Sequence, residues 1–140
     1  MYSIAEGNPE QLGCVTKGLI EFNQKQMGIS LVAPEKVTRI ASDENGKVLG
    51  GIVCTHTPIL DNLSVDILWV ANEYRGTGLG SVLLHSVEDY ARQQSCILAH
   101  LETMDFQAKD FYTKQGYSVF GTLEGPPGHT RYFINKAFTP

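Results

Sequence analysis

Long apolar runs, basic side chains and paired cysteines are all scarce in this sequence of 140 residues. No run comes near the roughly 20 apolar residues that a membrane-spanning helix needs, and no charged segment followed by an apolar one forms a secretory leader. These absences predict a cytoplasmic protein with no membrane partner. The 42% of hydrophobic residues are enough to build one core, so we expect a single domain, residues 1–140.

Basic side chains are outnumbered by acidic ones. There are 11 Lys and Arg against 15 Asp and Glu, which gives a net charge of -4. A nucleic-acid surface needs a basic stripe that neutralises phosphates, so the composition predicts no nucleic-acid partner. Cys14, Cys54 and Cys96 are odd in number, far apart and outside any Cys-x-x-Cys pair. They predict neither a disulfide framework nor a zinc site, and we expect no metal.

Glycine is concentrated in one short segment. Residues 75–80 read Arg-Gly-Thr-Gly-Leu-Gly, shortly after the apolar, strand-like run 67–70 and at the start of a helical pattern. Glycine has no Cβ and adopts positive φ, so successive main-chain N–H groups can converge on one anion. The following helix adds the unpaired donors of its first turn and the positive end of its dipole. The segment therefore predicts a phosphate-binding turn.

Two common phosphate-binding motifs do not fit this turn. A P-loop ends in Gly-Lys-Ser/Thr, but Gly80 is followed by Ser81, and the next lysine is Lys109. A dinucleotide fingerprint that began at Gly76 would need its third glycine at position 81, which is serine. The spacing that does fit is Arg-x-x-Gly-x-Gly, which resembles the acyl-CoA pyrophosphate loop of the GNAT superfamily of N-acyltransferases.

A second segment, residues 107–117, strengthens this resemblance. It reads Gln-Ala-Lys-Asp-Phe-Tyr-Thr-Lys-Gln-Gly-Tyr, which is similar to the Ala-x-x-Phe-Tyr-x-Lys-x-Gly-Phe segment that closes the cofactor cleft in the same superfamily. The two segments come in the family's order and at about its usual separation, and the resemblance extends to Phe138. The first forty residues match only in general layout.

Hydrophobic periodicity and turn residues predict an α/β protein with a mixed, α+β type of sheet. Asn8 and Pro9 favour the start of a helix that ends near Met27, and Asn45-Gly46 favours a hairpin. The other expected helices cover residues 79–93 and 107–115, and the expected strands cover 2–4, 37–42, 47–55, 63–70, 95–101, 117–123 and 131–138. Strand, glycine turn, helix and strand in succession make a parallel βαβ crossover. We therefore expect about seven strands, antiparallel at the ends of the sheet, and the resemblance implies a GNAT-like fold with a splayed cofactor cleft.

The resemblance implies that acetyl-CoA is the cosubstrate and coenzyme A the product. In such folds the pantetheine arm pairs with exposed strand backbone as an added strand would, and this pairing needs extended main chain rather than particular side chains. Carried over to this sequence, the cofactor-binding residues are Leu68, Trp69 and Val70 through their main chain, then Arg75, Gly76, Thr77, Gly78, Leu79, Gly80 and Ser81 around the pyrophosphate, and Phe111 and Lys114. Asp105 replaces an asparagine that often contacts the cofactor in relatives.

The resemblance also implies N-acetyl transfer by direct attack of a primary amine on the thioester in a ternary complex. An alkylammonium with a pKa of about 10.4 is only about one part in 10³ neutral at pH 7, so a base or a desolvating pocket must help. Tyr112 is the expected acid that protonates the departing thiolate. Asp66 alternates onto the strand face of Leu68 and Val70 and is the expected side-chain base. A water relay through Asp66, Ser64 or His56 is the alternative.

Three other histidines receive separate interpretations. His85, within the crossover helix, and His100, in an apolar strand, are expected to be structural, since a buried histidine usually satisfies a neighbour. His129 lies in the turn 125–130, where a role in specificity stays open because such loops commonly carry it.

The sequence does not identify the acceptor amine. The walls of the acceptor pocket should come from residues 22–36, 56–63 and 124–131, whose acidic side chains would tolerate a cation. We expect a small-molecule amine or a peptide amine as partner, and a homodimer is compatible because dimers are common among relatives. The alternative function is a non-catalytic acyl-CoA-binding sensor of the same fold. A thioesterase would need a nucleophile or a water-positioning acid, and a nucleotide-binding domain would need a Walker lysine.

Overall fold

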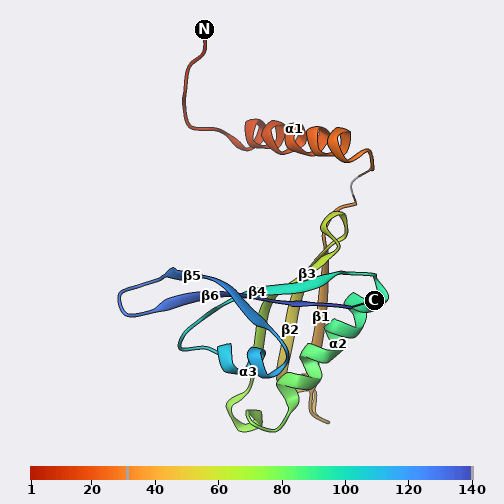
Figure 1. Ribbon diagram of the computed structural model, residues 1–140, viewed down its shortest axis with the longest axis vertical. Helices are drawn as coiled ribbons and strands as arrows, with labels where there is room; N and C mark the ends of the chain where they lie inside the picture. The colour runs from red at the N-terminus through yellow and green to blue at the C-terminus, as the bar shows by residue number, and fades with distance from the viewer. Residues whose placement is uncertain (31, 140) are drawn as a thin grey trace. The chain divides into compact units, whose positions relative to one another are not determined.

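A computed structural model describes residues 1–30 and 32–139 of the chain (Figure 1). The residues group by their contacts into two compact units, 1–32 and 33–140. Of the helices in the described ranges, none is long and apolar enough to cross a membrane. The single domain expected from the sequence stays a prediction.

The first unit contains helix α1, Pro9–Met27. Its start is capped reciprocally, because the Asn8 side chain accepts from the Gln11 N–H at 2.9 Å and the Gln11 side chain accepts from the Asn8 N–H at 3.0 Å. Gly28 ends the helix with a φ of 69° and donates to the Gln24 carbonyl. The helix predicted from the Asn8-Pro9 signal is confirmed.

The strand predicted at residues 2–4 is wrong. Tyr2 and Ile4 are 88% and 89% exposed, and in the described part of the chain no strand pairs with this segment. Alternating apolar residues over three positions favour extended backbone, but a strand also needs a neighbour to take up its hydrogen bonds. The sheet consequently has six strands instead of about seven.

The second unit is built on a six-stranded sheet with the order β1-β2-β3-β4-β6-β5. Its elements are β1 (Glu35–Ser42), β2 (Val48–Thr57), η1 (Pro58–Leu60), β3 (Asn62–Val70), η2 (Asn72–Tyr74), α2 (Leu79–Gln93), β4 (Leu98–Met104), α3 (Lys109–Lys114), β5 (Ser118–Glu124) and β6 (Thr130–Ala137). All neighbouring strands are antiparallel except β3 and β4, which are joined through α2. The predicted mixed sheet with a parallel crossover is confirmed.

The parallel contact between β3 and β4 is short. Residues 62–64 of β3 pair with residues 98–100 of β4, although β3 continues to Val70 and β4 to Met104. Past this contact, each strand is paired only on its other side, β3 with β2 and β4 with β6. The two strands therefore leave a wedge in the sheet, which is the splayed cleft that the family resemblance implies.

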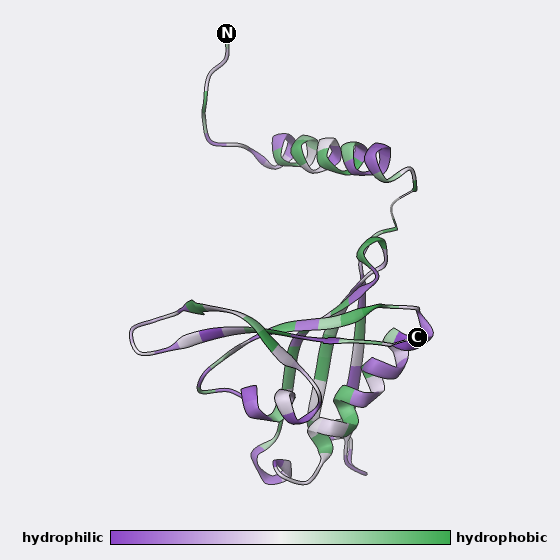
Figure 2. Ribbon diagram, viewed as in Figure 1, coloured by the Kyte–Doolittle hydropathy of each residue, from purple (hydrophilic) through white to green (hydrophobic). Residues whose placement is uncertain are grey.

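Helix α2 covers one face of this sheet and supplies much of its core (Figure 1). Leu84, Val87 and Ala91 recur at helical spacing and are fully buried, as are Ile52 of β2 and Leu63 of β3. In Figure 2 the central strands are mainly hydrophobic, while α2 alternates between hydrophobic and hydrophilic residues. Packing of this amphipathic helix fixes where its first turn lies relative to the end of β3.

Glu88 brings a charge into the core. Glu88 of α2 is 1% exposed, accepts a hydrogen bond from the Tyr117 hydroxyl at 2.8 Å and lies 3.2 Å from Lys136 Nζ. A carboxylate is tolerated at such a place only when its oxygens are paired. The cluster ties α2 to the residue that precedes β5 and to β6.

We predict that Leu84→Ala lowers the free energy of unfolding by about 2–5 kcal/mol, because a fully buried leucine leaves a cavity when it is truncated. Val82→Ala, on the exposed side of the same helix at 65% exposure, should change it by less than about 0.5 kcal/mol. Urea unfolding followed by circular dichroism measures both. Equal losses in the two variants would contradict the packing of α2 described above.

Candidate active site

The glycine turn presents a row of unpaired amides. Gly76 and Gly78 have φ values of 77° and 93°, and a Cβ built on either would meet no atom within 4 Å. Helix α2 starts at Leu79 without a side-chain cap. Among the described residues, none accepts from the N–H groups of residues 76–81, and the first paired amide is that of Val82, which donates to the Gly78 carbonyl at 3.1 Å. Consecutive free donors at the positive end of a helix form an anion site.

The start of α2 is packed against the second motif. The Cβ that Gly80 lacks would lie 3.4 Å from the Phe111 ring and 3.8 Å from the Val70 side chain. Gln115, which caps α3, donates to Ser81 Oγ at 2.9 Å. The end of β3, the first turn of α2 and helix α3 therefore meet, as the two sequence motifs predict.

The free main chain of β3 follows from its pairing with β2. The Ala71 N–H donates to the Leu49 carbonyl at 2.7 Å, which marks a hydrogen-bonded pair. Because such pairs alternate with non-hydrogen-bonded ones in an antiparallel ladder, the N–H and C=O of Trp69 point toward β2, and those of Leu68 and Val70 point into the wedge. The main chain of Trp69 is therefore already hydrogen-bonded to β2, which corrects our expectation that it binds the cofactor. The main chains of Leu68 and Val70 stay available for that role.

Arg75 closes the turn back onto β3. Its Nε donates to the Val70 carbonyl at 3.0 Å. This contact occupies one of the outward-facing carbonyls and places a positive charge next to the unpaired amides. The groups that remain directed into the wedge are the N–H and C=O of Leu68 and the N–H of Val70.

A cavity of about 550 Å³ opens where β3 and β4 separate. It is lined by both strands, by the aromatic rings of β5 and β6 and by one residue ahead of α3, namely Ser64, Val65, Asp66, His100, Leu101, Glu102, Thr103, Met104, Phe120, Phe133 and Gln107. Within residues 1–30 and 32–139, no group of three or more His, Cys, Asp or Glu side chains is placed to hold a metal ion.

Asp66 is held in this cavity by three donors. Thr55 Oγ1 donates at 2.6 Å, Ser64 Oγ at 2.8 Å and Lys36 Nζ at 3.5 Å. Partial burial raises the pKa of Asp66, but the hydrogen bonds and the Lys36 charge together outweigh it, so the pKa lies below its usual value. A carboxylate stabilised in this way is a weak proton acceptor.

The strand face predicted for Asp66 is wrong. β2 pairs Cys54 with Val65 but Val53 with Ile67, so Asp66 is the extra residue of a β-bulge. The bulge breaks the alternation of side chains along β3. Leu68 and Val70 after it pack on the α2 face, whereas the Asp66 carboxylate bonds to side chains on the opposite face. One sequence by itself carries no signal for such a bulge, because it depends on the register with β2.

Tyr112 lies on the α2 side of the sheet, where its ring packs edge-on against Phe111 and Tyr117 with centroids 5.1 Å and 5.7 Å away. Burial, together with the nearby Cys54 thiol, raises the pKa of Tyr112 to about 12. In the described ranges, no residue forms a hydrogen bond with the Tyr112 hydroxyl. Every fully buried side-chain polar atom in these ranges does have a hydrogen-bond partner, so the Tyr112 hydroxyl is not fully buried. The hydroxyl is therefore protonated at neutral pH and reaches an accessible position.

The remaining predicted residues are placed less centrally. Lys114 is exposed at the end of α3. His56 is buried against Tyr90, with Nδ1 3.1 Å from the hydroxyl, on the α2 face and away from Ser64 and Asp66. The structure therefore does not bring His56 into a relay with these two residues.

Asp105 has a role within the chain. Its carboxylate accepts from the Thr130 N–H and lies 2.9 Å from His129 Nδ1. These contacts, the main-chain one above all, hold the pKa of Asp105 below its usual value. Asp105 thus connects the β5–β6 turn to the end of β4. A carboxylate, which only accepts hydrogen bonds, suits this role because its partners are the Thr130 N–H and the His129 ring.

His100 is the cavity residue that sequence reasoning missed. It is half-buried and makes no hydrogen bond to any other residue in the described ranges, so it is not the satisfied core histidine that we expected. The alternation of β4 does place it opposite the buried Ala99 and Leu101. Only the wedge shows that this opposite face is a cavity.

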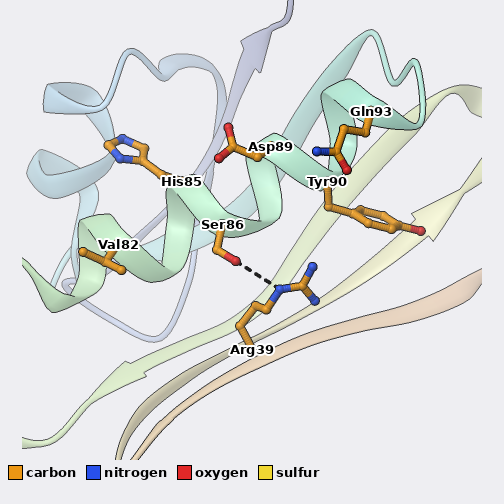
Figure 3. Close-up of a pocket in the computed structure, with 7 residues that line it drawn as sticks. All are labelled: Arg39, Val82, His85, Ser86, Asp89, Tyr90 and Gln93. Carbon is orange, nitrogen blue, oxygen red and sulfur yellow. Dashed lines mark hydrogen bonds between the residues drawn. The ribbon is translucent and has the colours of Figure 1, made fainter.

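A separate hollow of about 500 Å³ lies between β1 and the outer side of α2 (Figure 3). Arg39 reaches from β1 to Ser86, with Nε 3.0 Å from Oγ, and its guanidinium lies 6.0 Å from the centre of the Tyr90 ring. None of its lining residues belongs to either sequence motif or to the wedge. The candidate site is therefore the wedge.

The sequence matches the model of the Acetyltransferase (GNAT) family over residues 10–117, so the chain belongs to this family of acyltransferases. It is similar to Blasticidin-S acetyltransferase from Streptomyces morookaense, with 41% identity over 98 residues that cover 69% of this chain and 71% of that one. The crystal structure of an acetyltransferase from Bacillus cereus ATCC 14579 is 32% identical and has a TM-score of 0.86 over 98% of both chains. The family predicted from the two motifs is confirmed.

A more distant structure agrees in fold alone. It is an aminoglycoside 6'-N-acetyltransferase complexed with coenzyme A, 17% identical, with a TM-score of 0.67 over 99% of this chain and 97% of the other.

We predict that Gly78→Glu weakens the binding of coenzyme A at least about 100-fold, measured by calorimetric titration. The substitution places a carboxylate among the free amides and forces a side chain onto a positive φ, and two lost charge-assisted hydrogen bonds suffice for this factor.

Gly46→Glu is the matched control. Gly46 has a φ of 82° and the same open surroundings, but it lies in the β1–β2 turn. This variant has the same charge and similar strain, so it should bind coenzyme A like the unmodified protein. Unchanged affinity in both variants would rule out the glycine turn as the phosphate site.

Proposed function

We propose that this protein transfers the acetyl group of acetyl-CoA to a primary amine of a small, positively charged acceptor, by direct attack in a ternary complex. One observation carries the proposal. The unpaired amides of residues 76–81 and the outward-facing main chain of Leu68 and Val70 lead toward one cavity between β3 and β4. Membership of the family supports acetyl transfer, and the distant relative complexed with coenzyme A supports the cosubstrate.

The proposed binding of the cosubstrate uses mostly main chain. The diphosphate lies on the amides of residues 76–81, with Arg75 and the Ser81 hydroxyl beside it. The pantetheine amides pair with Leu68 and Val70 as an added strand would, and the acyl end reaches the cavity near the bulge. Phe111 packs beside the turn, and Lys114 is a further contact on the exposed side of α3.

The proposed chemistry needs no acyl-enzyme. The amine nitrogen attacks the thioester carbonyl, the C–N bond forms and the C–S bond breaks, and the electron pair leaves with sulfur. Tyr112 donates a hydrogen bond to that sulfur. With a pKa of about 12 against about 8.5 for a thiol, complete proton transfer from Tyr112 is uphill by about 5 kcal/mol, so the hydroxyl acts mainly by stabilising the developing charge.

The cavity favours a cationic acceptor. Asp66 and Glu102 line it from two strands, and Phe120 and Phe133 add rings that suit a flat or charged group. The similarity to Blasticidin-S acetyltransferase supports a small antibiotic amine as the class to test first. Because the family match begins within α1 and continues to residue 117, just before β5, it includes residues of both compact units and supports treating residues 1–140 as one acetyltransferase domain. A homodimer stays a prediction.

We predict that release of free thiol from acetyl-CoA depends on an amine. A suitable panel is blasticidin S, an aminoglycoside, an alkyl diamine and a peptide with a free N-terminus, with thiol measured by a colorimetric reagent. Release without amine would identify hydrolysis. Binding of coenzyme A without any release would identify a sensor and contradict the proposal.

Tyr112→Phe should lower kcat about 10–100-fold and leave the affinity for coenzyme A nearly unchanged, since the hydroxyl acts only on the departing sulfur. Tyr117→Phe is the control, because it removes a neighbouring hydroxyl that is bonded to Glu88. This control should cost about 1–3 kcal/mol of unfolding free energy and leave kcat intact. Equal kcat in Tyr112→Phe and the unmodified enzyme would dismiss the role of Tyr112.

A further inference from the structure

The proposed transfer leaves one proton without an acceptor. An ammonium ion loses two protons when it becomes an amide, and the departing sulfur takes up only one of them. Transfer from an ammonium of pKa about 10.4 to a carboxylate of ordinary pKa about 3.9 is uphill by roughly 9 kcal/mol. Asp66 is poorer still, because its oxygens already accept from Thr55 and Ser64 and lie near Lys36.

His100 stands where the wedge begins. It pairs with Ser64 in the last rung of the parallel ladder. Its neighbours Ala99 and Leu101 are buried on the α2 side, so the His100 side chain points to the opposite face, where it lines the cavity together with Asp66.

The imidazole of His100 is free to take part in chemistry. Each of the other three histidines of the chain hydrogen-bonds a neighbouring side chain. Within the described ranges, His100 has no such bond, and it is only half-buried. A neutral imidazole carries one unprotonated nitrogen that can accept a proton from a positioned donor.

Charged side chains lie in and beside this cavity. The charged side chains that line it are Asp66 of β3 and Glu102 of β4, and the cations that pair with them are Lys36 of β1 and Arg131 of β6. Lys36 pairs with Asp66 at 3.5 Å, and Arg131 pairs with Glu102. The residue of β6 opposite His100 is the neutral Asn135, and β5 contributes Phe120. The two carboxylates line the cavity itself, whereas Lys36 and Arg131 are not among its lining residues.

We propose that His100 is the residue that accepts the proton of the acceptor amine, an assignment that rests on the proposed function. The ammonium gives its first proton to an imidazole nitrogen, and the freed lone pair attacks the thioester carbonyl. The second nitrogen proton ends on the sulfur of coenzyme A as the C–S bond breaks. The imidazolium then returns its proton to solvent, so the sum is one amide, one thiol and one released proton.

The test compares His100→Gln with His85→Gln. Glutamine keeps the size and polarity of histidine but accepts no proton at neutral pH, and His85 is an exposed histidine of α2 outside the cavity. The assay uses acetyl-CoA and the amine of the panel that the unmodified enzyme acetylates fastest, with blasticidin S tried first. His100→Gln should lower kcat about 10²–10³-fold at pH 7 and leave the affinity for coenzyme A unchanged. His85→Gln should keep the original pH profile.

Two readouts separate proton transfer from a structural effect. The deficit of His100→Gln should shrink as the pH rises, because more of the amine is then neutral without help. His100→Ala should regain activity when imidazole is added to the buffer. A deficit that neither change relieves, or a kcat within about threefold of the original with the same pH profile, overturns the assignment of His100 alone. Absence of any amine-dependent turnover in the unmodified enzyme overturns the proposed function, and this assignment with it.

Discussion

The early separation of β3 from β4 is the constraint on which the site depends. Only residues 62–64 and 98–100 join the two strands, and the main chain of β3 beyond them must find other partners or stay open. Unpaired N–H and C=O groups are costly once water is removed, so proteins usually cover such an edge. Here Arg75 covers the Val70 carbonyl, and in the proposed function a ligand that has amides of its own pairs with the rest. Binding such a ligand and completing the sheet are then one and the same interaction.

In the proposed reaction, the sheet also keeps the two proton-handling steps apart. Tyr112 lies on the α2 side, in contact with a core that contains the buried Glu88 and Tyr117, whereas Asp66 and His100 lie on the opposite face. In this proposal, a thioester in the wedge meets Tyr112 from one face and the cavity with Asp66 and His100 from the other. The amine can therefore lose its first proton on one side while the sulfur is stabilised from the other, and neither group has to exchange protons directly with its counterpart.

Local signals in the sequence were sufficient for the parts of the fold that depend on local geometry. The caps at Asn8 and Gly28 define α1, and the glycine turn gives the first residue of α2, because both rest on main-chain conformation over a few residues. Pairing between distant strands is a different matter. Residues 2–4 alternate like a strand but have no partner, and the bulge at Asp66 exists only because β2 and β3 pair in one register and not another.

Asp66 and His100 show how this limit affects a site. The sequence points to Asp66, because a carboxylate on a strand near the cleft suggests a base, whereas the apolar strand around His100 indicates a buried, structural histidine. In the structure the hydrogen bonds that hold Asp66 make it a fixed negative charge with a lowered pKa. This carboxylate and the unengaged imidazole of His100 line the same cavity. In the proposed reaction the imidazole is therefore the proton site, an assignment that follows from which oxygens and nitrogens are already bonded.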